Sequence, residues 1–207
     1  MDKQFYPNNW FFRFMDKFVD CVLLNLFWIF SSLPIITIGA STTALYYTVV
    51  KALRNDHGSI RKEYWRAFRS NFKQATAIWL FFVLLLLFLG ADCLILYLLL
   101  DTAQILKWLF GILLVMFSIA LVWMQYSFSY AAKFSDPIKV ILKNSLYLFL
   151  SHLENSLWIF TILAGSFALL LAPPGPLLLL VFPTAPVLAI SYITEKLYIA
   201  LAPQGND

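Results

Sequence analysis

The chain has 207 residues, of which 61% are apolar and 18% aromatic, and its formal net charge is +4. An ordinary soluble domain is about 45 to 50% apolar, so this composition argues against a soluble globular protein. Charged residues are absent from four long stretches, namely residues 21–50, 74–91, 108–132 and 155–194. Because about 20 apolar residues carry an α-helix across the hydrocarbon core of a bilayer, the sequence predicts a polytopic, all-α transmembrane bundle.

The first hydrophobic region is interrupted by the segment SSLPIITIGAS, residues 31–41. Proline disfavours helical geometry at the residue before it, so Pro34 and the nearby Gly39 mark a helix break. We predict a first span over residues 16–33 and a second over 38–53. The break itself has two interpretations, because the chain either crosses the membrane once with a kink or turns round at Pro34 and comes back.

The distribution of Lys and Arg favours the turn. These residues concentrate in short cytoplasmic loops. If the chain turns back after Pro34, 14 of its 15 Lys and Arg lie inside and only Lys107 lies outside. A single crossing would place 11 of them inside and 4 outside. We therefore expect cytoplasmic N- and C-termini. The charge-free run of 30 residues is short for two full spans, so the first pair is short or re-entrant.

The most charged segment, residues 51–73, contains seven Lys or Arg. Within it, Ile60, Tyr64, Phe68 and Phe72 recur every four residues, which predicts an amphipathic helix at the membrane interface. A lipid-binding or partner-binding basic face is expected at Arg61, Lys62, Arg66, Arg69 and Lys73. The alternative is that these charges only fix the orientation of the chain in the membrane.

The rest of the chain alternates apolar runs with turn signals. We predict a third span over residues 75–97, a fourth over 108–130, and a second interfacial segment over 137–153 that begins after the helix-start signal SDP. A fifth span over 155–172 precedes the turn PPGP at residues 173–176, and a sixth covers 177–197. Residues 1–207 are thus expected to form one membrane domain of about six spans.

Two stretches resemble a known family: NNWFFRFMDKFVDCVLLNLFWIFSSLPIITIGASTTALYYTVVKALR and FRSNFKQATAIWL. They are similar to the YesL-like family of small bacterial integral membrane proteins, a group classed as a domain of unknown function. The resemblance is sharpest over residues 8–80. It implies a bacterial plasma-membrane protein of five or six spans, often encoded near carbohydrate-uptake transporters and glycan-degrading enzymes, and it implies no established reaction.

Several polar residues inside predicted spans are candidates for an intramembrane site. Ser118, Gln125 and Ser129 fall on one face of the fourth span, and Asn25 of the first span is placed to meet them. Asp92 is the carboxylate that we assign to the third span, and an intramembrane ionisable group is a functional candidate. The alternative is that Asp92 lies near the outer headgroups, about 28 Å along the helix from Lys73, where it is readily hydrated. The alternative for the uncharged residues is interhelical hydrogen bonding, worth about 0.6 kcal/mol each.

Catalytic and cofactor motifs give no positive signal. His57 and His152 have no neighbouring ligands at metal spacing, and the chain contains no phosphate-binding glycine loop and no nucleophile elbow. Nucleic-acid binding is also disfavoured, because the aromatic residues near the basic segment lie on a membrane-facing stripe. We therefore expect a non-enzymatic accessory protein without cofactors, in contact with the bilayer and with transporter subunits of a carbohydrate-uptake system. The competing hypothesis is a small secondary transporter or channel with a polar site near the broken first helix pair.

Overall fold

The computed structural model describes residues 10–99, 103–171 and 182–201, and within these ranges the chain is helical with short connections and no strand. The all-α prediction is confirmed for this part of the chain. The helices are α1 (Trp10–Ser32), α2 (Ile38–Thr48), α3 (Ile60–Leu98), α4 (Gln104–Lys133), α5 (Ile138–Ser151), α6 (Leu153–Leu171) and α8 (Thr184–Leu201). A single 3₁₀ turn, η1 (Ile35–Thr37), precedes α2, and a π-helical turn, η2 (Val49–Arg54), follows it.

The break at Pro34 reverses the direction of the chain. Helix α1 ends at Ser32, and Thr37 then donates its hydroxyl to the backbone oxygen of Ser31 at 2.6 Å. Farther from the turn, the Trp28 indole N–H of α1 donates to the Thr42 hydroxyl of α2 at 3.3 Å. Segments on either side of Pro34 therefore lie against each other, as the hairpin interpretation expects.

Helix α2 is the most enclosed element of the described chain. Eight of its eleven residues are buried, and it packs against both α3 and α4. The contact is closest at Gly39, where an added Cβ would lie 2.5 Å from the Trp79 Cβ and 2.6 Å from the Ala75 backbone oxygen. The absence of a side chain at Gly39 is therefore what lets the α2 and α3 backbones approach this closely.

Helix α3 joins two elements that the sequence analysis treats separately. The predicted interfacial helix after residue 60 and the predicted span over 75–97 form one continuous helix of 39 residues. No glycine or proline occurs from residue 60 to 89 to interrupt it. At 1.5 Å per residue the helix is about 58 Å long, so it extends well beyond a hydrocarbon core of about 30 Å.

Three described helices are long and apolar enough to cross a membrane: α3, α4 and α6. Six spans were predicted, and there is a physical reason why α1, α2 and α8 are not among the three. Helix α1 carries charges in its first half, α2 is too short, and α8 carries Glu195 and Lys196. The sixth predicted span begins at residue 177, whereas α8 begins at Thr184. The predicted turn at 173–176 and residues 177–181 lie outside the described residues.

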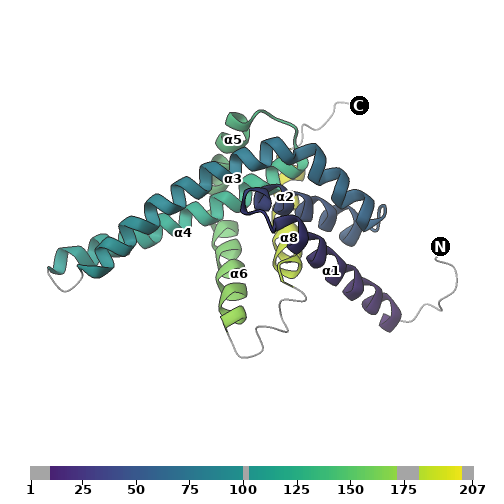
Figure 1. Cartoon of the computed structure of the whole chain (residues 1–207), viewed down its shortest axis with the longest axis horizontal. Coiled ribbons are helices and arrows are strands. Elements are labelled where there is room, and N and C mark those ends of the chain that lie inside the picture. Colours follow the sequence, from purple (N-terminus) through teal and green to yellow (C-terminus); the bar gives the residue numbers. More distant parts are fainter. Residues whose placement is uncertain (1–9, 100–102, 172–181, 202–207) are drawn as a thin grey trace.

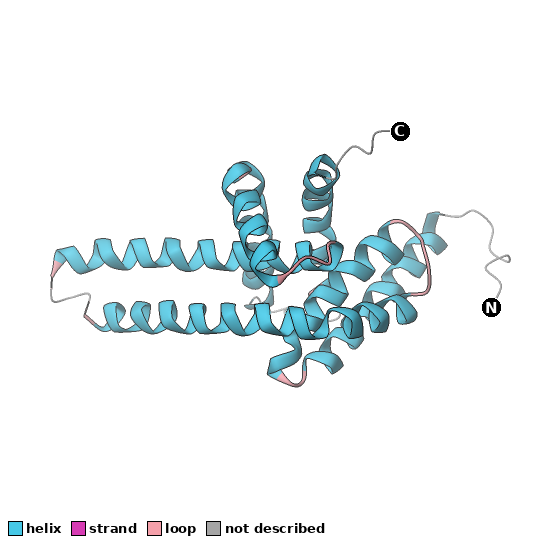
Figure 2. Cartoon of the chain, turned by 90° about the horizontal axis from the view of Figure 1, so that it is seen from above, coloured by secondary structure: helices cyan, strands magenta, loops and turns pink. Residues whose placement is uncertain are grey.

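The spanning helices are arranged as a long pair with a divergent third member. Helices α3 and α4 run antiparallel and side by side, whereas α6 leaves this pair at a steep angle (Figures 1 and 2). The buried residues of α4 all lie from Ala120 onward, and the first half of the helix exposes apolar side chains such as Trp108 and Ile112. The fold is thus packed at one end of the α3–α4 pair and open at the other.

The close approach at Gly39 predicts a large effect of a small substitution. Gly39→Ala should lower the free energy of unfolding by about 1 to 3 kcal/mol, the usual cost of overpacking, because backbone atoms of α3 would have to move. The measurement is detergent-induced unfolding followed by circular dichroism. Gly165→Ala in α6 is the matched control, since its added Cβ meets nothing within 4 Å and should be neutral or slightly stabilising. Equal loss of stability in both variants would contradict this account of the packing.

Candidate functional site

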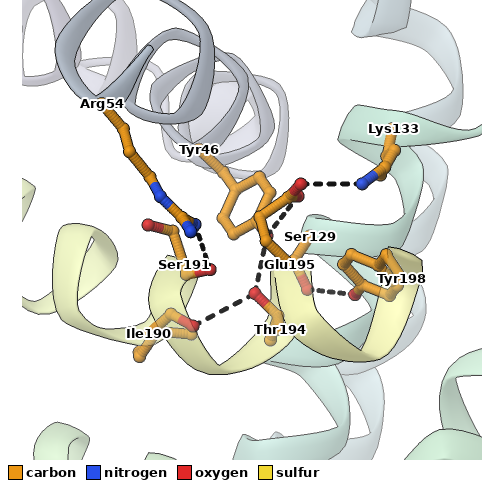
Figure 3. A network of polar contacts seen from close by, with 9 residues as sticks. All are labelled: Tyr46, Arg54, Ser129, Lys133, Ile190, Ser191, Thr194, Glu195 and Tyr198. Atoms are coloured by element: carbon orange, nitrogen blue, oxygen red, sulfur yellow. Dashed lines mark hydrogen bonds and ion pairs between the residues drawn. The ribbon is translucent and has the colours of Figure 1, made fainter. Parts of the chain in front are cut away.

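The most connected polar cluster of the fold lies where α2, α4 and α8 meet (Figure 3). Its centre is an ion pair of 2.7 Å between Lys133 Nζ of α4 and Glu195 Oε2 of α8. The side chains are 30% and 11% exposed, respectively. The other carboxylate oxygen, Oε1, accepts a hydrogen bond of 3.2 Å from the Tyr46 hydroxyl of α2. One carboxylate thus joins three helices.

Two further hydroxyl contacts extend this cluster along α8. Tyr46 and Thr194 share a hydrogen bond of 2.6 Å, and Thr194 also donates to the Ile190 backbone oxygen. One turn later, the fully buried Tyr198 shares a hydrogen bond of 2.7 Å with Ser129 of α4. In addition to Glu195, therefore, Thr194 bonds α8 to α2 and Tyr198 bonds α8 to α4.

The π-helical turn η2 carries two cations, of which Arg54 lies at the edge of the cluster (Figure 3). Arg54 donates to the Ser191 backbone oxygen at 2.9 Å, and its guanidinium lies 4.3 Å from the centre of the Tyr192 ring. Lys51 pairs with Glu63 of α3 at 2.8 Å. The hydrogen bond to Glu63, together with a second one to Tyr47, raises the pKa of Lys51 above its ordinary value.

The arrangement favours a structural role over a chemical one. Both oxygens of Glu195 already accept bonds from Lys133 and Tyr46, so neither is directed at open space. Within the described ranges, no group of three or more His, Cys, Asp or Glu side chains is placed to hold a metal ion. The cluster holds α8 against α2 and α4. An unpaired charge at this position would lower the free energy of unfolding.

The structure separates the polar residues that the sequence places in one site. Asn25 Oδ1 accepts hydrogen bonds from the backbone N–H, at 3.0 Å, and the hydroxyl of Thr184, at the start of α8. Ser118 bonds back to the Leu114 backbone oxygen of its own helix. Gln125 is buried, and its side-chain Nε2 makes no hydrogen bond. Asp92 lies near the far end of α3, half-buried and remote in sequence from these groups.

Of this predicted set, Ser129 is the member that enters the cluster around Glu195. The carboxylate that the structure buries at a helix junction is Glu195 rather than Asp92, and the sequence analysis missed it. A signal was present: Ser191, Thr194, Glu195 and Tyr198 recur at i, i+3, i+4 and i+7, which places four polar groups on one face of a largely apolar helix.

A separate apolar groove lies between α4 and α6, and Phe149 of α5 also lines it. Its volume is about 480 Å³. It is lined by aliphatic and aromatic side chains of both helices, and the only hydroxyls among its lining residues are Ser118 and Ser156. The groove follows from the divergence of α6 from the α3–α4 pair, which leaves this face of α4 uncovered.

Together, the helical fold and its three apolar helices define a membrane protein. Comparison with protein families finds a match over residues 21–93 to the family described as "Protein of unknown function, DUF624". The matched segment covers about a third of the chain and contains about half of α1, all of α2 and most of α3. Comparisons with curated proteins and with solved structures find no match.

The central ion pair gives a test of the structural role. Glu195→Ala should lower the free energy of unfolding by about 1 to 3 kcal/mol, which is less than for a fully buried pair because Lys133 is partly exposed. Replacing Lys133 and Glu195 together by Met should recover part of this loss, because no unpaired charge remains. Detergent-induced unfolding measures both.

A surface ion pair of the same protein supplies the control. Lys17 and Asp56 lie 3.9 Å apart with side chains 51% and 65% exposed, so Lys17→Gln should change stability by less than about 1 kcal/mol. A loss as large as that of Glu195→Ala would show that the buried position of the α8 pair is not what matters.

Proposed function

We propose that this protein is a non-enzymatic accessory component of a bacterial plasma membrane that binds another membrane protein through its apolar helix surfaces. One observation carries the proposal: within the described chain the buried carboxylate Glu195 is already paired inside the fold, while the spanning helices leave large apolar faces without a partner. The partner of Glu195 is Lys133, whose ammonium lies 2.7 Å from the carboxylate.

The exposed apolar faces are large and lie on all three spanning helices. Leu84 and Phe88 of α3 are 69% and 66% exposed, Trp108 of α4 is 71% exposed, and Leu157 of α6 is 67% exposed. Lipid chains cover such surfaces in part. The groove between α4 and α6, however, is a concave apolar site of about 480 Å³, and a groove of this kind accepts a helix or side chains of a partner.

Resemblance to the YesL-like family supports a more specific form of the proposal. The match over residues 21–93 is consistent with that family. On this basis we propose that the partner is a membrane subunit of a carbohydrate-uptake system. The distribution of Lys and Arg supports a multi-pass topology with both termini in the cytoplasm.

Photocrosslinking in native membranes tests this function. A benzophenone side chain at Leu157, which lines the groove, should crosslink to a transporter membrane subunit that mass spectrometry identifies. The matched control is the same label at Leu84, which is equally exposed but lies on α3, away from the groove. Crosslinks to lipid alone from Leu157, or equal protein crosslinks from both positions, would argue against a partner in the groove.

A second candidate, a small transporter or channel, has one observation in its favour. The Gln125 side-chain Nε2 is buried without a hydrogen-bond partner, as is expected of a group that contacts a solute or water during transport. Reconstituted proteoliposomes should show no flux of mono- or oligosaccharides if the accessory function holds. Gln125→Leu is the informative variant, because it removes no hydrogen bond that the fold uses. Flux that disappears in this variant would replace the accessory function by transport.

A further inference from the structure

Four of the exposed cations of α3 form a straight stripe. Lys62, Arg66, Arg69 and Lys73 are spaced by four, three and four residues, and at 3.6 residues per turn they fall within about 60° of one another around the helix. Tyr64 lies on the opposite side, where it is fully buried and shares a hydrogen bond with Ser31 of α1. Packing of α1 against that side therefore directs the stripe outward.

The stripe has no ion-pair partner in the described chain. The three ion pairs found there are Lys17–Asp56, Lys51–Glu63 and Lys133–Glu195. The acids closest to the stripe in sequence are thus already paired with other cations. Like charges three and four residues apart destabilise a helix by a few tenths of a kcal/mol per pair, so anionic groups bound along the stripe would relieve this repulsion.

The same helix fixes where the stripe lies relative to the membrane. Lys73 directly precedes the charge-free run that begins at residue 74, and α3 is continuous through this point. Along the helix, Arg69 lies about 6 Å, Arg66 about 10 Å and Lys62 about 16 Å from Lys73. The headgroup layer is about 5 to 7 Å thick on each side of the core, so Lys73 and Arg69 lie at headgroup depth.

A second element adds positive charge next to this position. The Gln74 side chain donates a hydrogen bond to the Asp136 backbone oxygen, immediately before α5. This contact brings the start of α5 beside the membrane end of the stripe. Helix α5 carries the exposed Lys139 and Lys143. Lys139, three residues after Asp136, is therefore the α5 cation closest in sequence to this contact, while the Asp136 carboxylate, which accepts a hydrogen bond from the Tyr130 hydroxyl, adds one negative charge there.

We infer that the stripe on α3 binds the headgroups of anionic phospholipids in the surrounding membrane. Its cations complement the lipid phosphates, and the apolar part of the same helix holds them at the depth where those phosphates lie. The attraction falls off within a Debye length of about 8 to 10 Å, so Lys73 and Arg69 contribute more than Lys62. This inference does not depend on which protein occupies the groove.

Native mass spectrometry of the purified full chain in neutral detergent tests the inference, with phosphatidylglycerol and phosphatidylcholine as the probes. The unmodified protein should retain phosphatidylglycerol in preference to phosphatidylcholine. The double variant Arg69→Gln with Lys73→Gln should bind phosphatidylglycerol about thirtyfold more weakly, since each cation near the surface contributes about a factor of five. Its affinity for phosphatidylcholine should not change.

Arg61→Gln with Lys107→Gln is the matched control. It removes the same charge. Arg61 belongs to the basic face predicted from the sequence, but it lies about 100° from Lys62 around α3 and about 18 Å from Lys73 along it. Lys107 lies in the first turn of α4, which follows the C-terminal end of α3 in the chain, so phosphatidylglycerol binding should change by less than about twofold. Arg69→Lys with Lys73→Arg keeps both charges and should retain binding, while circular dichroism checks that all variants are folded. Equal losses in the two Gln double variants would overturn the inference. Displacement of the lipid by inorganic phosphate would also overturn it. So would the absence of any preference for phosphatidylglycerol in the unmodified protein, and that result would point to an acidic protein as the ligand instead.

Discussion

The packing of the described chain depends on the contact between α2 and α3 at Gly39. Because no side chain separates the two helices there, α2 lies deep against α3, and the Phe128 ring of α4 is only 3.2 Å from the position that a Cβ would occupy. Helix α2 thereby becomes an enclosed core element instead of a lipid-facing span. Its polar side chains are consequently buried, and they need partners within the protein.

The cluster around Glu195 supplies such partners. Tyr46 is carried into the interior by α2, and its hydroxyl is bonded by Thr194 and Glu195 of α8. Glu195 in turn needs the charge of Lys133. Asn25 of α1 accepts bonds from Thr184 at the other end of α8. Helix α8 is therefore positioned at both ends by polar contacts, which set its place among helices whose apolar faces alone would allow other arrangements.

The sequence predicts local features of this structure better than it predicts their assembly. Pro34 locates the turn between α1 and α2, and the charge-free runs locate α4, α6 and the apolar part of α3, because these signals are contained in neighbouring residues. The enclosure of α2 could not be predicted, since it depends on which helices meet Gly39. For the same reason Ser118, Gln125 and Ser129 share a helix face yet have different surroundings, and Glu195 gains its role from residues more than 60 positions away.

The segment that matches the family model contains the Gly39 contact and the four cations Lys62, Arg66, Arg69 and Lys73, but it ends before Lys133 and Glu195. It also contains the Lys51–Glu63 pair, which links the end of α2 to the start of α3. The matched segment therefore covers the turn between α1 and α2, the contact of α2 with α3, and the junction in α3 between its basic part and its charge-free part. The groove between α4 and α6 lies beyond the match, because all of its lining residues follow residue 93. A partner that binds there would therefore contact residues outside the matched segment.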